Sequence, residues 1–245
     1  IKPLVMAEVD GGMIFASEMK GLRAHEAHVP VLDEGALALR LAWEYPLDMT
    51  TLIQDTRQVR PGTVEVWTLD EHGRAIMTSR ADIERQHLTP ASSWDPSTEA
   101  PALLESFIVS VEQRLMADVP VGIVLSGGLD SALVAAVAHE AAERAGQPVP
   151  EVWTVAGSED NPDWKAAEAV ASALDLKHHQ HLLDEGDFDR HLPNLVWHGE
   201  DLDTSVMFFQ PLFQTMASSV KVGLCGQGAD ELHACLLYPS PRPRD

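Results

Sequence analysis

Three consecutive segments between residues 121 and 146 constrain the fold most. Residues 121–125 (VGIVL) are apolar on both faces, as expected of a strand buried in a parallel sheet. Residues 126–131 (SGGLDS) follow at once. Residues 131–145 then form an alanine-rich stretch that predicts a helix ended by Gly146. A strand that passes directly through a loop into a helix is the repeating unit of α/β proteins.

The same alternation continues along the chain to residue 225. Further strands are predicted at residues 151–156, 179–183 and 220–225. Helices are predicted at residues 103–115, 164–174, 192–198 and 207–217, with Pro193 and Pro211 expected to break or bound the last two. We therefore predict an α/β, Rossmann-like domain with helices on both faces of a parallel sheet, which binds ligands at the carboxyl ends of its strands.

The chain before this domain has a different pattern. Residues 3–16 predict two strands joined by a turn at Asp10-Gly11-Gly12, residues 35–45 a helix, and residues 63–68 a strand. Residues 86–101 are polar and rich in proline, which is typical of a linker. We predict domains at residues 1–90 and 91–232. The start at Ile1 suggests a fragment, and residues 233–245, with three prolines in the last seven residues, suggest a non-native tail.

The composition bounds the partners. The net charge of −21 disfavours nucleic acid, because an acidic surface repels phosphate backbones. No apolar run approaches the roughly 18 residues that cross a bilayer. The two cysteines, Cys225 and Cys235, do not resemble a disulfide framework, and no signal peptide opens the chain. We therefore expect no membrane partner and a cytoplasmic location.

The loop at residues 126–131 has the chemistry of a phosphate site. Gly127 and Gly128 allow backbone torsions that turn successive N–H groups toward one anion, and the following helix adds free N–H donors. Ser126 and Ser131 supply hydroxyl groups, and Asp130 supplies an oxygen ligand suited to Mg²⁺. The loop is no Walker A motif, because it has no lysine. The alternative is a glycine-rich turn with no ligand.

The SGGLDS loop resembles the pyrophosphate loop of the ATP-pyrophosphatase family, whose members cleave ATP between the α and β phosphates. Its flanks resemble one branch of that family, the glutamine-hydrolysing asparagine synthetases. Residues 116–122 (MADVPVG) and 226–232 (GQGADEL) are similar to that branch, and residues 1–4 (IKPL) and 14–22 (IFASEMKGL) to the end of its glutaminase domain. The resemblance implies an adenine-nucleotide α-hydrolase-like domain, preceded by a remnant of an α+β glutaminase domain.

The resemblance also implies roles for individual residues. It implies Mg²⁺ binding by Asp130 and Asp230, which would otherwise be loop caps or exposed charges. It places Gln227, Asp230 and Glu231 in the catalytic loop. Many relatives have Glu where this chain has Gln227, and an amide cannot act as a general base. The residues implied in ATP binding are Leu125, Ser126, Gly127, Gly128, Leu129, Asp130, Ser131, Ala156, Cys225 and Gly226.

Some of these residues also have a structural interpretation that involves no ligand. Leu125 and Ala156 could be core, and Ala156 stands where valine is more usual. Cys225 ends a predicted buried strand, so we expect a core residue rather than a nucleophile. His179 and His181 share one face of a predicted strand and could chelate a metal. No third ligand stands at suitable spacing, so we expect no metal there.

The implied activity is amidation of aspartate with ATP and ammonia from glutamine, through an acyl-adenylate, with release of AMP and pyrophosphate. The family's N-terminal cysteine nucleophile has no counterpart near Ile1, so we expect no glutamine hydrolysis by this chain. A homodimer is possible by resemblance. Two alternatives stay open: another ligase on the same scaffold, such as a peptide amidotransferase or a β-lactam synthetase, and a non-catalytic nucleotide-binding module.

Overall fold

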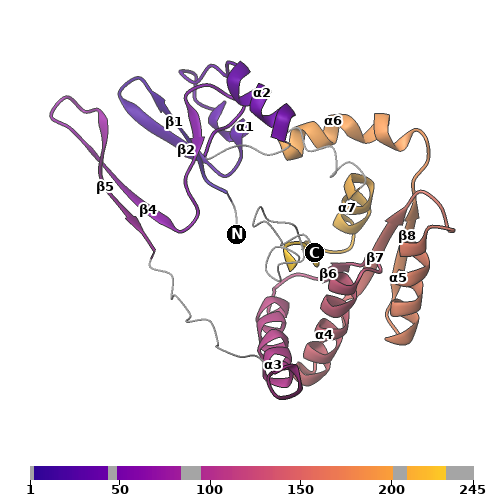
Figure 1. Ribbon diagram of the computed structural model, residues 1–245. Coiled ribbons are helices and arrows are strands. Elements are labelled where there is room, and N and C mark those ends of the chain that lie inside the picture. Colours follow the sequence, from indigo (N-terminus) through magenta and orange to yellow (C-terminus); the bar gives the residue numbers. More distant parts are fainter. Residues whose placement is uncertain (1–2, 44–48, 84–94, 201–208, 230–245) are drawn as a thin grey trace, which may run out of the picture. The chain divides into compact units, whose positions relative to one another are not determined.

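The chain forms two compact units in the computed structural model (Figure 1). The first unit contains Ile1–Pro90 and Pro193–Thr204, and the second contains Ala91–Leu192 and Ser205–Asp245. The structure describes residues 3–43, 49–83, 95–200 and 209–229.

The first unit is built on antiparallel strands. Strand β1 pairs with β2 on one side and β3 on the other, and β4 pairs with β5 in a separate two-stranded sheet. The predicted hairpin is confirmed, with Gly11 in its turn at a φ of 77° that favours glycine. The elements are β1 (Val5–Val9), β2 (Gly12–Ala16), α1 (Met19–Leu22), α2 (Glu34–Trp43), β3 (Thr56–Gln58), β4 (Thr63–Leu69) and β5 (Ala75–Asp82).

The second unit contains the predicted parallel sheet. Its strand order is β8-β7-β6-β9, and all three pairings are parallel. The chain moves from β6 through β7 to β8 and then returns to place β9 on the other side of β6. The order therefore reverses beside β6, where parallel sheets bind ligands. The strands are β6 (Val121–Val124), β7 (Glu151–Ala156), β8 (His178–Leu182) and β9 (Val222–Leu224).

Helices cover both faces of this sheet. Buried side chains of α3, α4 and α5 pack with Ile123, Leu125 and Val152 on one face, while Leu212 and Met216 of α7 pack with Trp153 on the other. Alternate residues of a strand point to opposite faces, so Val152 and Trp153 belong to different cores. The helices are α3 (Pro96–Leu115), α4 (Leu129–Ala145), α5 (Pro162–Ala173), α6 (Asp187–Gly199) and α7 (Phe209–Ala217).

Several predicted boundaries were wrong. Residues 96–101, expected in the linker, form the start of α3, because Asp95 caps the helix by accepting a hydrogen bond from Ser97 N and Pro96 occupies a first-turn position that tolerates proline. Helix α4 begins at Leu129, so Asp130 lies in its first turn. Pro193 lies inside α6 and does not bound it.

Candidate functional site

The residues 126–131 connect β6 to α4 at the carboxyl end of the sheet. Leu125 ends the buried part of the strand and is fully buried, whereas Ser126 and Gly128 are exposed. Gly128 is the N-cap residue of α4, and within the described residues no side chain caps that helix. The first N–H groups of α4 therefore have no side-chain cap, and such groups at a helix start are the kind that can bind an anion.

Two serine hydroxyl groups fix the shape of this loop. Ser131 Oγ accepts a hydrogen bond from Ser126 N at 3.1 Å and donates one to Gly128 O at 3.1 Å. Because Ser131 has a single hydroxyl proton, the 2.9 Å contact between the two Oγ atoms is donated by Ser126. Ser126 Oγ in turn accepts from Gly128 N at 3.3 Å. Ser131 is buried, so its contribution to the site in this structure is to hold the loop closed.

Gly127 allows α5 to approach the loop. Its φ is 81°, in the region that favours glycine, and a Cβ atom there would lie only 2.7 Å from Ala167 N. Any side chain would therefore push the loop away from the first turns of α5. Both the backbone torsion and the lack of space for a Cβ atom therefore favour glycine at position 127.

The second predicted loop lies against the first. Residues 226–229 follow β9, the neighbour of β6, and form a turn in which Ala229 N donates to Gly226 O at 3.3 Å. A Cβ atom on Gly226 would lie 2.8 Å from Ser131 N and 2.9 Å from the carbonyl carbon of Asp130. The backbone of Gly226 thus touches the first turn of α4. The two loops therefore meet at the point where the strand order reverses, although Ser131 and Gly226 are 95 positions apart in the sequence.

The structure also gives positions for other predicted site residues. Gln227 and Leu129 are exposed, and the side chain of Ala156 at the end of β7 is buried. Cys225, expected in the core, is exposed. Cys225 follows β9, which is an edge strand of the described sheet, and residues at a sheet edge are less covered than residues at its centre. The predicted burial of Cys225 was therefore wrong. Asp230 and Glu231, and residues 233–245, lie outside the described residues.

The loop is supported by Thr154, which the sequence did not single out, and by His178, which the sequence suggested only as one of a group of histidines. Thr154 Oγ1 donates a hydrogen bond of 2.6 Å to Leu125 O, and His178 Nε2 lies 2.7 Å from Thr154 Oγ1. One indication of this role for Thr154 was present in the sequence: it is a threonine inside the otherwise apolar run of residues 152–156. A hydroxyl group buried in such a strand requires a hydrogen-bond partner. Burial lowers the pKa of the His178 imidazole, which favours its neutral form.

The side chains of His179 and His181 in β8 lie beside aromatic and acidic side chains. The His179 ring stacks on Trp153 at a centroid distance of 4.5 Å, and its Nε2 atom lies 2.6 Å from Glu151 Oε2. His181 Nε2 lies 3.8 Å from a carboxylate oxygen of Asp187. Across the part of the chain that the structure describes, no group of three or more His, Cys, Asp or Glu side chains could hold a metal ion.

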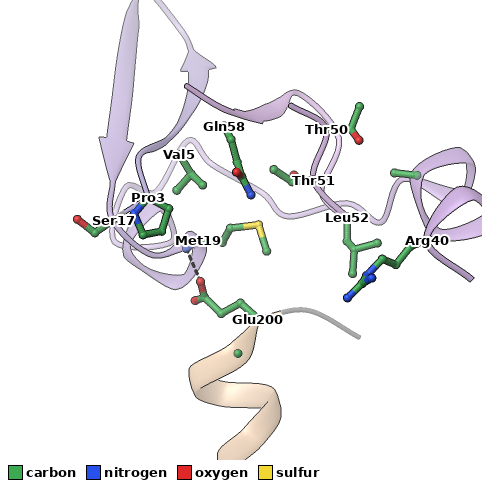
Figure 2. Close-up of a pocket in the computed structure, with 12 residues that line it drawn as sticks. Pro3, Val5, Ser17, Met19, Arg40, Thr50, Thr51, Leu52, Gln58 and Glu200 are labelled. Atoms are coloured by element: carbon green, nitrogen blue, oxygen red, sulfur yellow. Dashed lines mark hydrogen bonds between the residues drawn. The ribbon is translucent and has the colours of Figure 1, made fainter. Parts of the chain in front are cut away.

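The first unit contains a cavity of about 140 Å³. Glu200 lines it, and its carboxylate accepts a hydrogen bond from the backbone N–H group of Met19 at 2.6 Å (Figure 2). The same carboxylate accepts a second one from the backbone N–H group of Lys20 at 2.7 Å. None of the residues at 125–131 lines this cavity.

No helix within the described ranges is long and apolar enough to cross a membrane.

The fold and the two loops define an α/β protein with a glycine-rich loop at the point where its sheet reverses order. The asparagine synthase family model matches residues 102–244 of this chain. An asparagine synthetase [glutamine-hydrolyzing] of Asparagus officinalis is 36% identical over 241 residues, which are 94% of this chain and 35% of that protein. Asparagine synthetase [glutamine-hydrolyzing] 2 of Arabidopsis thaliana is 37% identical over 158 residues, 61% of this chain and 27% of that protein.

The chain belongs to the asparagine synthase family. It spans about a third of the length of the Asparagus relative and less of the Arabidopsis one. Among solved structures, an NH3-dependent NAD synthetase from Campylobacter jejuni has a TM-score of 0.38 and 17% identity, over 54% of this chain and 58% of that one. At that TM-score the likeness supports no further conclusion.

Proposed function

We propose that this chain carries the ATP site of a ligase that converts aspartate to asparagine through an acyl-adenylate. The contact of Gly226 with the first turn of α4 is the main support, because it unites the two loops of the family at one place. The names of the relatives, which are glutamine-hydrolysing asparagine synthetases, support the same activity. The alternative of a glycine-rich turn without a ligand does not account for the second loop.

The phosphates of ATP would lie on the first turn of α4. The backbone N–H groups of Gly127, Leu129 and Asp130 and the positive end of the helix dipole favour an anion there. The donor set also fits a magnesium ion, since Asp130 offers carboxylate oxygens in that turn and the proposal adds Asp230. The ion, when bound, supplies positive charge to the triphosphate oxygens. Leu125, Ala156, Cys225 and Gly226 would contact the adenosine.

The chemistry then needs positioning and charge stabilisation. A carboxylate oxygen of aspartate attacks the α-phosphorus, and the bond from that phosphorus to pyrophosphate breaks. Ammonia attacks the activated carbonyl carbon, loses a proton, and displaces AMP. Gln227 cannot remove that proton, so we assign any such role to Glu231. The donor of ammonia would be glutamine, with residues 1–90 as the end of the glutaminase domain.

One observation favours a second candidate. Gln227 is exposed. The resemblance to the family implies Glu at this position, in the loop proposed to face the acceptor carboxylate. A ligase of the same scaffold that activates another carboxylate would also fit. We also propose that the protein is cytoplasmic. We propose that it forms a homodimer, and analytical sedimentation would test this assembly.

The test is pyrophosphate release from MgATP with ammonium ions and a panel of amino-acid carboxylates. We expect release that depends on aspartate and falls at least about 100-fold in Asp130→Ala, as is common when a group that stabilises charge in the transition state is removed. Asp118→Ala is the matched control, because Asp118 is an exposed aspartate just before the other end of β6. Release with another acid alone would select the second candidate. Release with none from folded protein would reject both activities for this chain.

A further inference from the structure

A chain of hydrogen bonds crosses three strands and ends at the residue before the phosphate loop. It runs from His178 of β8 through Thr154 of β7 to the carbonyl oxygen of Leu125, over 2.7 and 2.6 Å. Thr154 is 2% exposed and Leu125 is fully buried. Water therefore does not compete for the bond between them, and losing it would leave a buried carbonyl group with a poorer partner.

The protons of this chain have one consistent arrangement. The Thr154 hydroxyl group has a single proton, and that proton is donated to Leu125 O. Thr154 Oγ1 must therefore accept from His178 Nε2, so the imidazole carries a proton on Nε2. Burial lowers the pKa of this imidazole, whereas Glu168 raises it and His179 lowers it further. The neutral ring with a proton on Nε2 is the expected form at neutral pH.

The carbonyl group held in this way is the last backbone group before Ser126. Leu125 N donates to Trp153 O at 2.8 Å, so β7 holds both backbone polar groups of Leu125. The direction in which the chain leaves β6, and with it the position of the N–H groups at residues 126–131, depends on this anchoring.

We propose that Thr154 and His178 are positioning residues for the phosphate loop: the hydrogen-bonded pair holds Leu125 so that the N–H groups of residues 127–131 that do not donate to the loop's own hydroxyl groups face a nucleotide. This inference rests on the proposed function for the identity of the ligand. The hydrogen bonds and their effect on the loop can be tested without any ligand.

The test uses four variants of the whole chain. Thr154→Val keeps the shape and removes the hydroxyl group, and Thr154→Ser restores it. Thr51→Val is the matched control, because Thr51 is a buried threonine of the first unit whose Oγ1 donates to backbone oxygens, at 3.0 Å from Thr56 O. Amide hydrogen exchange at residues 126–131, MgATP affinity and thermal unfolding are measured for each variant. The ring ¹⁵N shifts of His178, assigned by their loss in His178→Phe, are measured in the unaltered chain.

We expect Thr154→Val to bind MgATP about 3- to 10-fold more weakly and to exchange loop amides faster, with Thr154→Ser close to the unaltered chain. Thr51→Val should unfold at a lower temperature without either change. A proton on Nδ1 instead of Nε2 in neutral His178 would overturn the proposal, as would equal loop exchange in Thr154→Val and Thr51→Val. If the unaltered chain binds no MgATP, the proposed function fails, and loop exchange and the ¹⁵N shifts still decide the role of Thr154. If Thr154→Val does not fold, the ¹⁵N shifts alone decide it.

Discussion

At the scale of single residues, the site depends on positions where a side chain cannot fit. Gly226 has no room for a Cβ atom, because the backbone of Ser131 and Asp130 would lie 2.8 and 2.9 Å away. Both neighbours are backbone atoms of α4 and cannot rotate away as a flexible side chain could. The distance between the two loops is therefore set by the absence of a methyl group.

We expect Gly226→Ala to weaken MgATP binding at least about tenfold, a loss of roughly 1.4 kcal/mol, because separating the loops moves the N–H groups of α4 from the phosphates. Isothermal titration of MgATP measures the effect. Gly12→Ala is the control, since a Cβ atom on Gly12 meets nothing within 4 Å. Equal affinities of Gly226→Ala and the unaltered chain would show that the contact between the loops does not matter for nucleotide binding.

Only part of the candidate site could be predicted from the sequence. The loop at residues 126–131 was recognisable because glycines, hydroxyl groups and a carboxylate follow a buried strand. Its internal bonds were not, since the burial of Ser131 and its hydrogen bond to Gly128 depend on how α4 begins. Thr154 gave a weak signal, because a threonine is also an ordinary residue of a strand.

At the scale of elements, the start of α6 is held by a buried carboxylate. Asp187 accepts hydrogen bonds from Asp184 N and from Arg190 Nη2, both at 2.7 Å. The Nε2 atoms of His181 and His191 lie 3.8 and 3.6 Å from it. The N–H group of Asp184, together with Arg190, holds the pKa of the Asp187 carboxyl below its ordinary value of 3.8.

A carboxyl group whose pKa is lowered by folding stabilises the fold above its unfolded pKa and loses this effect as the pH falls through the folded pKa. We expect Asp187→Asn to lower the free energy of unfolding by about 1–3 kcal/mol at neutral pH. The difference from the unaltered chain should shrink as the pH falls below 3.8. Urea unfolding over this range measures it, with Asp189→Asn, an exposed aspartate of the same helix, as the control. A difference independent of pH would contradict this role for the charge.

The elements of the parallel sheet were predicted better than those of the first unit. Strands such as β6 and β7 are short apolar runs between helices, so their period and length indicate their type. By contrast, β3 (three residues) and α1 (four residues) are too short for a periodic pattern, and β5 carries mostly exposed side chains. Pro193 inside α6 was unexpected. The division between the units falls at this proline, since Leu192 ends the first segment of the second unit and Pro193 begins the second segment of the first.

At the scale of the whole molecule, the net charge of −21 opposes the binding of a polyphosphate. We therefore expect ATP without Mg²⁺, in the presence of a chelator, to bind several-fold more tightly as ionic strength rises from about 0.01 M to about 0.15 M, because salt screens the repulsion. Adenosine, which is uncharged, should show no such dependence. Weaker binding of ATP at higher salt would mean that local positive charge at α4 outweighs the charge of the molecule.

The proposed activity requires a bond between an aspartate oxygen and the α-phosphorus of ATP. The most direct measurement supplies aspartate labelled with ¹⁸O in its side-chain carboxylate, together with MgATP and ammonium ions, and determines by mass spectrometry where the label goes. Since the attacking oxygen stays on phosphorus when ammonia displaces AMP, we expect AMP to carry one ¹⁸O atom and the new amide to keep the other. Unlabelled AMP, or ADP and phosphate in place of AMP and pyrophosphate, would contradict the proposed activity.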